Sequence, residues 1–400
     1  MSWIRRVGCT IIVLAVLLTV TGCWSSREIE DLSVYLGLGI DTPRETPLEK
    51  YLTKEGAEYP KQNNITATVQ IAPGHVKSTK SAEEGSNTSN KSSYSNEQLT
   101  GDSLLQIFRH FALLRDRPLI GHHLKVIVIS KDVAKKYRLD QLLDFVLRDN
   151  DIRLNCLVLL SHERALDVLT LKDQSEVPAF YLTGMVNNSY LINKILEPMT
   201  LAKLDAKLKA GSSFLLQNVV SFDGDDKFSG AGIFSGKTTK YIGALSQTDL
   251  EGLAWINLQS RAGIVKTYNK EGYTVVYETK KNKTTITPTV RGQDISFHVN
   301  VESEGWLMED WIIPETEEKG AYLKELEKDF ADIAEQQIEQ VLHKLQRTYK
   351  VDVADFGEVL RIKEPKVWKQ VKDNWDEVFS ESKITYKVKV KVTSRGSSTK

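Results

Sequence analysis

The sequence has 400 residues, which exceeds one ordinary domain and predicts two or three. Apolar residues make up 41% of the chain and charged residues 26%, the balance of a globular protein that can bury hydrophobic cores. Lysine plus arginine equals aspartate plus glutamate, at 53 each. Because no net positive charge draws the chain toward nucleic acid, we expect no nucleic-acid partner.

The first residues have the order of an export signal. Arg5 and Arg6 precede an apolar run from Ile11 to Leu18, and Val20-Thr21-Gly22-Cys23 follows. The apolar run is shorter than the roughly 20 residues that a membrane-spanning helix needs. The alternatives are an ordinary signal peptide with a chance cysteine and a retained membrane anchor.

The tetrapeptide that ends at Cys23 resembles the lipobox of bacterial lipoproteins. This resemblance implies an S-diacylglycerol on Cys23, cleavage between Gly22 and Cys23, and an N-acyl group such as palmitate on the new terminus. Diacylglycerol buries enough methylene groups to anchor a protein durably. We therefore expect a signal peptide over residues 1–22 and a mature chain held on a lipid bilayer through Cys23.

Strand and helix patterns alternate in the first half of the chain. Apolar residues predict strands where they form short runs, and helices where they recur at three or four positions. The predicted strands are 33–40, 65–71, 124–129 and 154–160. The predicted helices are 104–114, 139–148, 162–171 and 180–209, the last interrupted by Pro198. This order indicates βαβ units and a partly parallel sheet. The Ser- and Asn-rich stretch 77–96 lacks apolar periodicity, so we expect a flexible loop there.

The pattern changes at Gly211, where helix-poor sequence begins. The predicted strands are 214–222, 228–234, 263–268, 273–280, 284–290 and 295–302, with helices at 317–349 and 367–379. Segment 384–392 alternates with lysines on one side, which is typical of an edge strand. We therefore predict a multidomain protein of mixed α/β and α+β class. Its N-terminal α/β region covers 23–210, with room for two subdomains, and its C-terminal α+β domain covers 211–395, where an antiparallel sheet packs with long helices.

Two motifs resemble metal sites but have simpler interpretations. His122-His123 has no carboxylate or cysteine at ligand spacing, which favours a loop or the start of a strand. Asp223-Gly224-Asp225-Asp226 begins like a calcium loop, but Phe234 stands at the twelfth position, where that loop needs Glu. A hairpin turn between two strands is preferred. We expect no metal site.

Two further features indicate core packing. Cys156 lies in the apolar run 154–160 and has no cysteine partner in the mature chain, so we interpret it as a buried hydrophobe. Trp368 and Trp375 stand seven residues apart and share one helix face. The sequence shows no nucleophile–base pair and no phosphate-binding loop, so we expect no catalytic residue, no enzymatic activity and no cofactor.

Motifs spread along the chain resemble one family. The N-terminal ones are Trp24, Arg27-Glu28-Ile29, Asp31-Leu32, Gly39-Ile40-Asp41, 123–129, 142–145, Arg148-Asp149 and Ile152-Arg153. The C-terminal ones are 222–230, Glu251-Gly252, Trp255, Asp355-Phe356-Gly357, Trp368, Trp375 and the closing strand. In order and spacing they resemble the Ger(x)C family, the lipoprotein C subunits of bacterial spore nutrient germinant receptors.

The resemblance implies a non-enzymatic, lipid-anchored subunit on the outer face of the spore inner membrane. It also implies two partners, the membrane subunits A and B of the receptor, of which B is permease-like, and a role in the response to nutrient germinants.

Two other functions remain open. A solute-binding lipoprotein of a transport system would be expected to have two similar lobes of βαβ units, which the antiparallel pattern of the second half argues against. An exported enzyme needs groups that converge only in the fold, so their absence from the sequence is weak evidence against it.

Overall fold

The structure is a computed structural model that describes residue 3 and residues 31–57, 60–62, 64–72, 92–257, 263–311 and 319–394. The expected signal peptide, the lipobox with Gly22 and Cys23, and most of the expected loop 77–96 lie outside these residues. Within the described part of the chain, no helix has the length and apolar character needed to cross a membrane.

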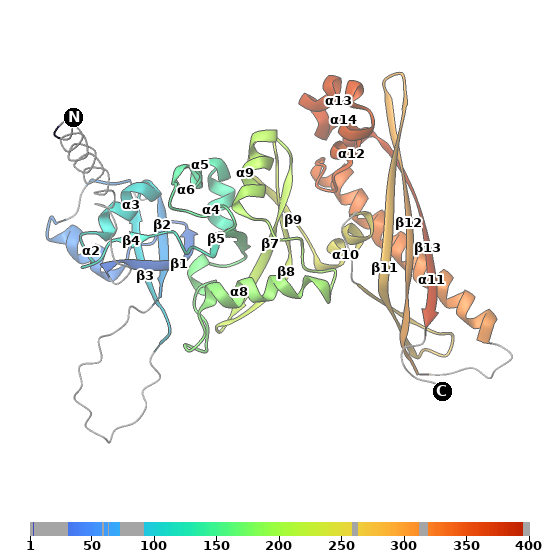
Figure 1. The fold of residues 1–400 in the computed structure, drawn as a ribbon, viewed down its shortest axis with the longest axis horizontal. Helices are drawn as coiled ribbons and strands as arrows, with labels where there is room; N and C mark the ends of the chain where they lie inside the picture. The colour runs from blue at the N-terminus through green and yellow to red at the C-terminus, as the bar shows by residue number, and fades with distance from the viewer. Residues whose placement is uncertain are drawn as a thin grey trace.

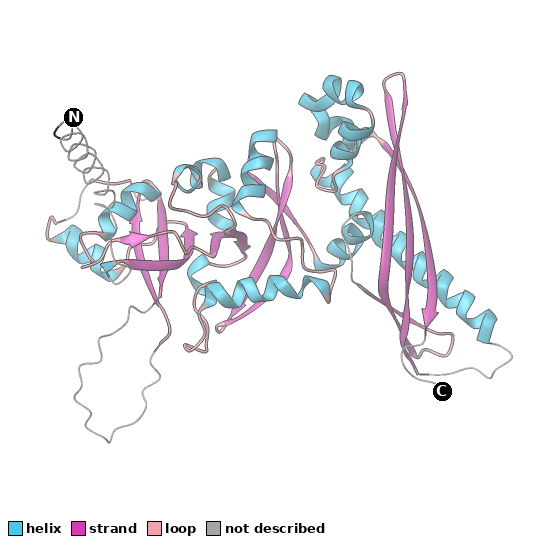
Figure 2. Cartoon of the chain, viewed as in Figure 1, coloured by secondary structure: helices cyan, strands magenta, loops and turns pink. Residues whose placement is uncertain are grey.

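Two β-sheets follow one another along the long axis of an elongated molecule, each with its own helices (Figure 1). Strands of the first sheet are flanked by short helices, whereas one long helix lies along the second sheet (Figure 2). The predicted multidomain, mixed α/β class is confirmed.

The first sheet is partly parallel, as predicted. Along its main path the order is β3-β2-β1-β5-β6-β7-β8-β9, and the short β4 pairs with β1. Strands β1, β5, β6 and β7 are parallel neighbours, whereas the pairings at both flanks are antiparallel. The strands are β1 (Ser33–Asp41), β2 (Ile65–Ile71), β3 (Ser95–Gly101), β4 (Leu119–Ile120), β5 (Val126–Ser130), β6 (Leu157–Ser161), β7 (Phe214–Phe222), β8 (Asp225–Phe234) and β9 (Tyr241–Leu245).

Helices cover both faces of this sheet, which explains why β5 and β6 are buried along their whole length. One face packs against α3 (Leu104–Phe111), α4 (Lys131–Lys136), α5 (Leu139–Leu142), α6 (Asp144–Arg148) and α9 (Leu201–Ala210). The other face packs against α7 (Ala165–Val168) and α8 (Pro178–Asn187), which is followed by a 3₁₀ turn, Asn188–Tyr190. Helix α2 (Pro47–Lys54) lies in the connection from β1 to β2.

The first sheet extends beyond residue 210, where we expected the first region to end. Strand β7 pairs in parallel with β6 through Leu160↔Asn218 and Ser161↔Val219, and β8 and β9 continue the sheet. The change of pattern at Gly211 therefore marks the step from parallel to antiparallel pairing within one sheet. The loop expected over 77–96 is also too long, because β3 begins at Ser95.

The second sheet has the order β10-β11-β12-β13. Its packing against helices was predicted. Its first three strands are antiparallel, and β13 adds in parallel to β12. The strands are β10 (Ile264–Tyr268), β11 (Thr274–Arg291), β12 (Asp294–Asp310) and β13 (Lys383–Ser394). The segments predicted as two strands, 273–280 and 284–290, form the single strand β11, whose polar centre stays paired with β12.

Long and short helices complete the second part. They are α10 (Gln247–Ile256), α11 (Lys319–His343) with a π-helical turn (Lys344–Tyr349), α12 (Phe356–Lys363), α13 (Pro365–Val371), a 3₁₀ turn (Lys372–Asn374) and α14 (Trp375–Glu381). The helix predicted over 367–379 is thus broken at its centre. Strand β13 is an edge strand with its lysines exposed, as predicted, and Glu335 and Glu327 of α11 accept hydrogen bonds from the backbone of Val388 and Val392.

Helix α10 connects the two sheets by crossing α11 at very short range. A Cβ on Gly252 would lie 2.2 Å from the backbone oxygen of Gln337. Trp255 donates its indole N–H to Gln337 at 2.8 Å, and Gln337 donates to Glu251 at 3.0 Å. Trp255 lies in a continuous core that also contains Leu245 from the first sheet and residues of the second. The crossing therefore joins the two sheets into one body.

A buried carboxylate fixes one end of this crossing. Asp249 and Ser246 form a capping box at the start of α10. Gln340 and Lys344 donate to the two oxygens of Asp249 at 2.8 and 2.6 Å. Although burial opposes ionisation, the bonds from Lys344 and Ser246 lower the pKa of Asp249. The charge on Asp249 is therefore satisfied at both the helix start and the partner helix.

Replacement of Gly252 by alanine tests the close crossing. We expect Gly252→Ala to lower the free energy of unfolding by about 2 kcal/mol, because the methyl group forces two backbones apart. Gly184→Ala in α8 is the matched control, since no atom lies within 4 Å of its added Cβ, and we expect it to be neutral or stabilising. Denaturant unfolding of both purified variants measures the difference, and equal midpoints would contradict the packing argument.

Candidate functional site

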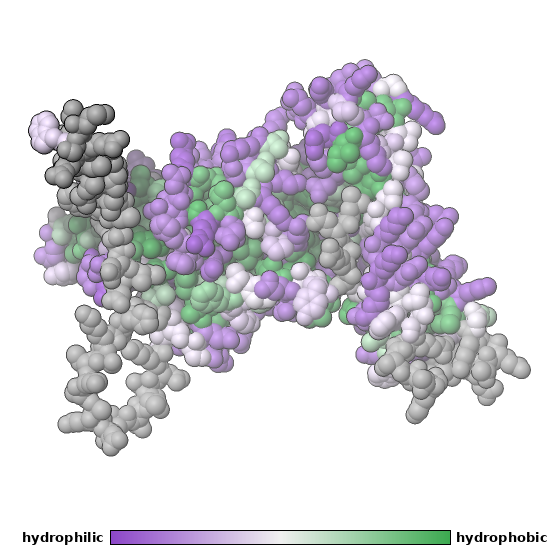
Figure 3. All heavy atoms as spheres, viewed as in Figure 1, coloured by the Kyte–Doolittle hydropathy of each residue, from purple (hydrophilic) through white to green (hydrophobic). Residues whose placement is uncertain are grey.

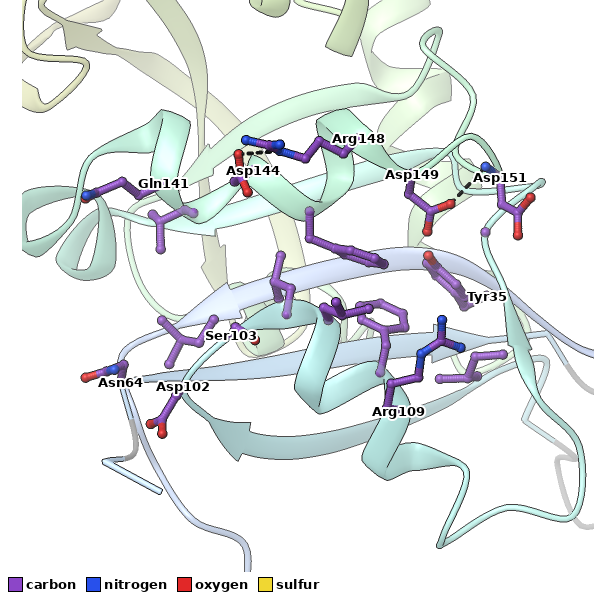
Figure 4. Close-up of a pocket in the computed structure, with 18 of the residues that line it drawn as sticks. Tyr35, Asn64, Asp102, Ser103, Arg109, Gln141, Asp144, Arg148, Asp149 and Asp151 are labelled. Atoms are coloured by element: carbon purple, nitrogen blue, oxygen red, sulfur yellow. Dashed lines mark hydrogen bonds and ion pairs between the residues drawn. The ribbon is translucent and has the colours of Figure 1, made fainter. Parts of the chain in front are cut away.

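A groove opens on the face of the first sheet that packs against α3 and α6, and it is the best candidate for a functional site. Its volume is about 940 Å³. One wall is α3, the other is α6 with the turn that follows it, and Tyr35 of β1 contributes from the sheet (Figure 4). Segments far apart in the sequence thus meet at one place.

Local sequence explains how α3 forms its wall. Ser103 caps the helix by accepting the backbone N–H of Gln106 at 3.2 Å. Leu104, Ile107 and Phe111 are buried against the sheet. The helical period then turns Leu105, Phe108 and Arg109 toward the groove. Leu105 keeps 46% of its surface exposed, so the wall offers an open apolar side chain.

Three aromatic rings form the apolar base of the groove. The ring of Phe108 lies 5.2 Å from that of Tyr35 and 5.6 Å from that of Phe145, measured between centroids. Burial, followed by the carboxylate of Asp149, raises the pKa of Tyr35 far above its ordinary value, so its hydroxyl stays protonated. Gly121 leaves room for this hydroxyl, because an added Cβ would lie 2.6 Å from its oxygen.

The rim of the groove has more carboxylates than cations. Its lining contains four aspartates and two arginines. Arg148 pairs with Asp144 at 2.8 Å. Asp149 accepts the backbone N–H of Asp151 at 2.9 Å, which holds the turn after α6. The net formal charge of the lining is therefore negative: Asp149, Asp151 and Arg109 lie near Tyr35, and Asp102 lies at the opposite end (Figure 4).

The sequence alone predicts no residue of this groove as a binding residue. Phe145, Arg148 and Asp149 belong to a motif of the family resemblance, but their role was not assigned. The sequence of α3 does indicate an exposed apolar surface, because Leu105 and Phe108 lie outside the helix face that is buried against the sheet. That signal alone does not identify the opposite wall, which only the fold supplies.

Two buried aspartates are structural caps, Asp41 of the Gly39-Ile40-Asp41 motif and Asp352, which precedes the Asp355-Phe356-Gly357 motif. Asp41 is 1% exposed and accepts the backbone N–H groups of Ala165 and Leu166, at the start of α7, at 2.8 and 3.2 Å. Asp352 accepts the backbone N–H of Gly357 at 2.7 Å and the indole N–H of Trp375 at 2.8 Å. Each carboxylate satisfies the free N–H groups of a helix start.

Packing around Trp375 explains the Phe356-Gly357 motif. A Cβ on Gly357 would lie 2.5 Å from the indole nitrogen, so only glycine lets the ring approach. Trp375 also stacks edge-on against Trp368 at 5.4 Å between ring centroids. The predicted packing role of the two tryptophans is confirmed.

The remaining residues singled out in the sequence are not brought together. His122 lies 3.6 Å from Asp151 at the surface. Cys156 is 1% exposed, and burial raises the pKa of its thiol, which confirms it as a buried hydrophobe. Among the residues that the structure describes, no three His, Cys, Asp or Glu side chains are grouped as metal ligands. Cys23 is outside them, so its lipid stays a prediction.

The Asp223–Asp226 motif forms the predicted hairpin turn between β7 and β8. Asp223 and Gly224 have φ of +51° and +76°, the left-handed pair that a two-residue hairpin requires. Asp226 follows as a buried residue, and neither of its carboxylate oxygens has a hydrogen-bond partner among the described residues. Burial is the main cause that raises its pKa to about 7; the nearby Ser221 side chain opposes the rise, and the charges of Asp225 and Glu163 add to it.

Replacement of Asp226 tests the cost of this buried carboxylate. The pKa of Asp226 in the folded protein lies above its ordinary value of 3.8. Between these two pKa values, Asp226 is therefore protonated in the folded state and ionised in the unfolded state. Its contribution to the free energy of unfolding therefore falls as pH rises from roughly 4 to 7, and stays low above that. We expect Asp226→Asn to remove this fall, on the order of 3 kcal/mol between pH 5 and pH 8.

Denaturant unfolding at the two pH values measures this change. Asp225→Asn is the matched control, because Asp225 is exposed and is only a secondary cause of the raised pKa. It should keep most of the pH dependence. If Asp226→Asn keeps the wild-type dependence, the carboxylate is not the group responsible.

Comparison with known proteins gives matches along both halves of the chain. A family model described as "Spore germination protein N-terminal domain" matches residues 25–220, and one described as "Spore germination B3/ GerAC like, C-terminal" matches residues 229–396. The spore germination protein YndF of Bacillus subtilis (strain 168) is 45% identical over 396 residues, which cover 98% of this chain and 97% of that protein.

A second relative and a solved structure agree. Spore germination protein B3 of the same strain is 30% identical over 383 residues, covering 95% of this chain and 96% of that protein. The crystal structure of the GerBC protein matches with a TM-score of 0.60 at 26% identity, covering 92% of this chain and 100% of that chain. The chain therefore belongs to the Ger(x)C family of spore germination proteins, which its motifs resemble.

Proposed function

We propose that this chain is the lipid-anchored C subunit of a spore germinant receptor, needed for the response to nutrient germinants. The observation that carries the proposal is the match to spore germination proteins over almost the full length of both partners. Because both halves of the chain match, the likeness to these relatives extends over the whole architecture and is not confined to one domain. Membrane subunits A and B of the receptor are the proposed partners.

The proposed location is the outer face of the spore inner membrane, with the chain held there by the lipid on Cys23. The leader and lipobox in residues 1–23 support it.

The aromatic base and charged rim of the groove support a role in binding. Its lining residues include no His, Cys or Lys, and its one serine, Ser103, caps α3. The motif residue Asp41 and the buried Asp352 stabilise helix starts, which is a structural role.

A solute-binding lipoprotein is the second candidate, and the topology disfavours it. Such proteins usually have two similar lobes with a ligand site between them. Here the second sheet has three antiparallel strands and one parallel edge strand, with α11 packed against it, whereas the first sheet is parallel at its centre. The two parts are therefore not repeats of one unit.

Replacement of Cys23 tests the anchor and the receptor role together. We expect Cys23→Ala to lose incorporation of a labelled fatty acid and to leave the membrane fraction, because no thiol remains to carry the diacylglycerol. Cys156→Ala is the control, since this buried thiol is far from its reactive form, and it should label normally.

Germination of intact spores then measures the functional consequence. Nutrient-triggered loss of optical density should fall strongly for Cys23→Ala and stay near wild type for Cys156→Ala. Immunoblots of the spore membranes confirm the amount of each protein. Full nutrient germination with an unlabelled, unanchored Cys23→Ala protein would refute the proposed role of the lipid.

A further inference from the structure

Three properties of the groove between α3 and α6 limit what can occupy it. The first is size. A volume of about 940 Å³ lies at the upper end of the roughly 300–1,000 Å³ that drug-sized ligands occupy. A single amino acid or sugar would fill only a small part of it, whereas several residues of a peptide fit.

The second property is charge. Four aspartates against two arginines leave the lining with an excess of negative charge, and Arg148 is already paired with Asp144. Asp149 and Asp151 lie together in the turn after α6, beside the hydroxyl of Tyr35, and Arg109 faces them from α3, so this end still has one more carboxylate than arginine (Figure 4). An occupant with a cationic group at this end of the groove is therefore favoured.

The third property is the combination of aromatic rings and an open apolar side chain. The ring of Tyr35 lies near Asp149 and is followed by the rings of Phe108 and Phe145, and a carboxylate next to an aromatic ring is suited to an ammonium or guanidinium group. Leu105 of α3 is 46% exposed on the wall and offers contact to a neighbouring apolar side chain. In space-filling view, apolar surface lies among hydrophilic patches over this part of the molecule, whereas hydrophilic residues predominate over α11 (Figure 3).

We propose that the groove between α3 and α6 binds a basic peptide segment of a membrane partner subunit. A Lys or Arg side chain of that segment lies between Asp149 and the aromatic rings, and an apolar neighbour packs on Leu105. This inference rests on the proposed function, because it takes the partner from the receptor complex.

Photo-crosslinking of the full-length protein in spore membranes tests the inference. A photoreactive residue replaces Leu105 on the groove wall, and in a control variant it replaces Ile362, which is 65% exposed on α12. The expected result is a several-fold higher yield of adducts from position 105, mapped by mass spectrometry to a Lys- or Arg-containing segment of a membrane protein. Equal yields from both positions, or adducts confined to acidic segments, overturn the inference.

Two charge variants in the same assay distinguish a basic occupant from a zwitterionic one. Asp149→Asn removes the charge but keeps an acceptor oxygen for the backbone of Asp151, so the turn is preserved, and we expect roughly tenfold fewer adducts. Arg109→Ala removes a cation of the same sign as the proposed segment, so adducts should increase. If Arg109→Ala instead lowers the yield as much as Asp149→Asn, the groove recognises a carboxylate as well, and the basic-peptide inference is wrong.

These outcomes are separable from those of the Cys23→Ala experiment. If Cys23→Ala abolishes nutrient germination while position 105 crosslinks no better than position 362, only the groove inference fails. If Cys23→Ala spores germinate fully, the anchoring role fails regardless of what position 105 contacts.

Discussion

The short-range crossing of α10 and α11 at Gly252 is the constraint on which the arrangement of the molecule depends. Helix α10 leaves the first sheet after β9 and meets α11, which covers the second sheet. Backbone contact at Gly252 leaves no space for a side chain, and Asp249 and Trp255 bond to α11 on either side of it. A flexible linker would let the two sheets move independently, whereas this junction holds them in one relative orientation.

Buried aspartates recur at the starts of helices throughout the chain. Asp41, Asp249 and Asp352 each accept N–H groups at a helix N-terminus, where the helix dipole favours a negative charge. Asp352 also binds the indole of Trp375, and Asp249 binds Lys344. These contacts stabilise short helices that would not be stable alone. Asp226 is the contrasting case, because it is buried without a partner among the described residues.

With the proposed lipid on Cys23, an elongated body with a groove in its first part is suited to contact membrane partners. The groove lies on the sheet that begins at Ser33, ten residues after the expected lipid site at Cys23. That short connection keeps the groove near the bilayer if Cys23 is lipidated. The second sheet lies farther along the molecule (Figure 1) and ends in a lysine-bearing edge strand whose backbone is partly occupied by Glu327 and Glu335. Such an edge is protected from pairing with another sheet.

The sequence by itself determined the features that are local along the chain. The family motifs, the alternation of strands and helices, the Asp223-Gly224 turn and the buried Cys156 follow from neighbouring residues, and the lipobox prediction is of the same kind. Only the tertiary structure decided that β7 pairs with β6, that β11 runs unbroken through its polar centre, that Gly252 touches Gln337, and that α3 and α6 form one groove. Strand pairing and helix contact join residues that are distant in the sequence, and the local periodicity of apolar residues does not indicate which segments will meet.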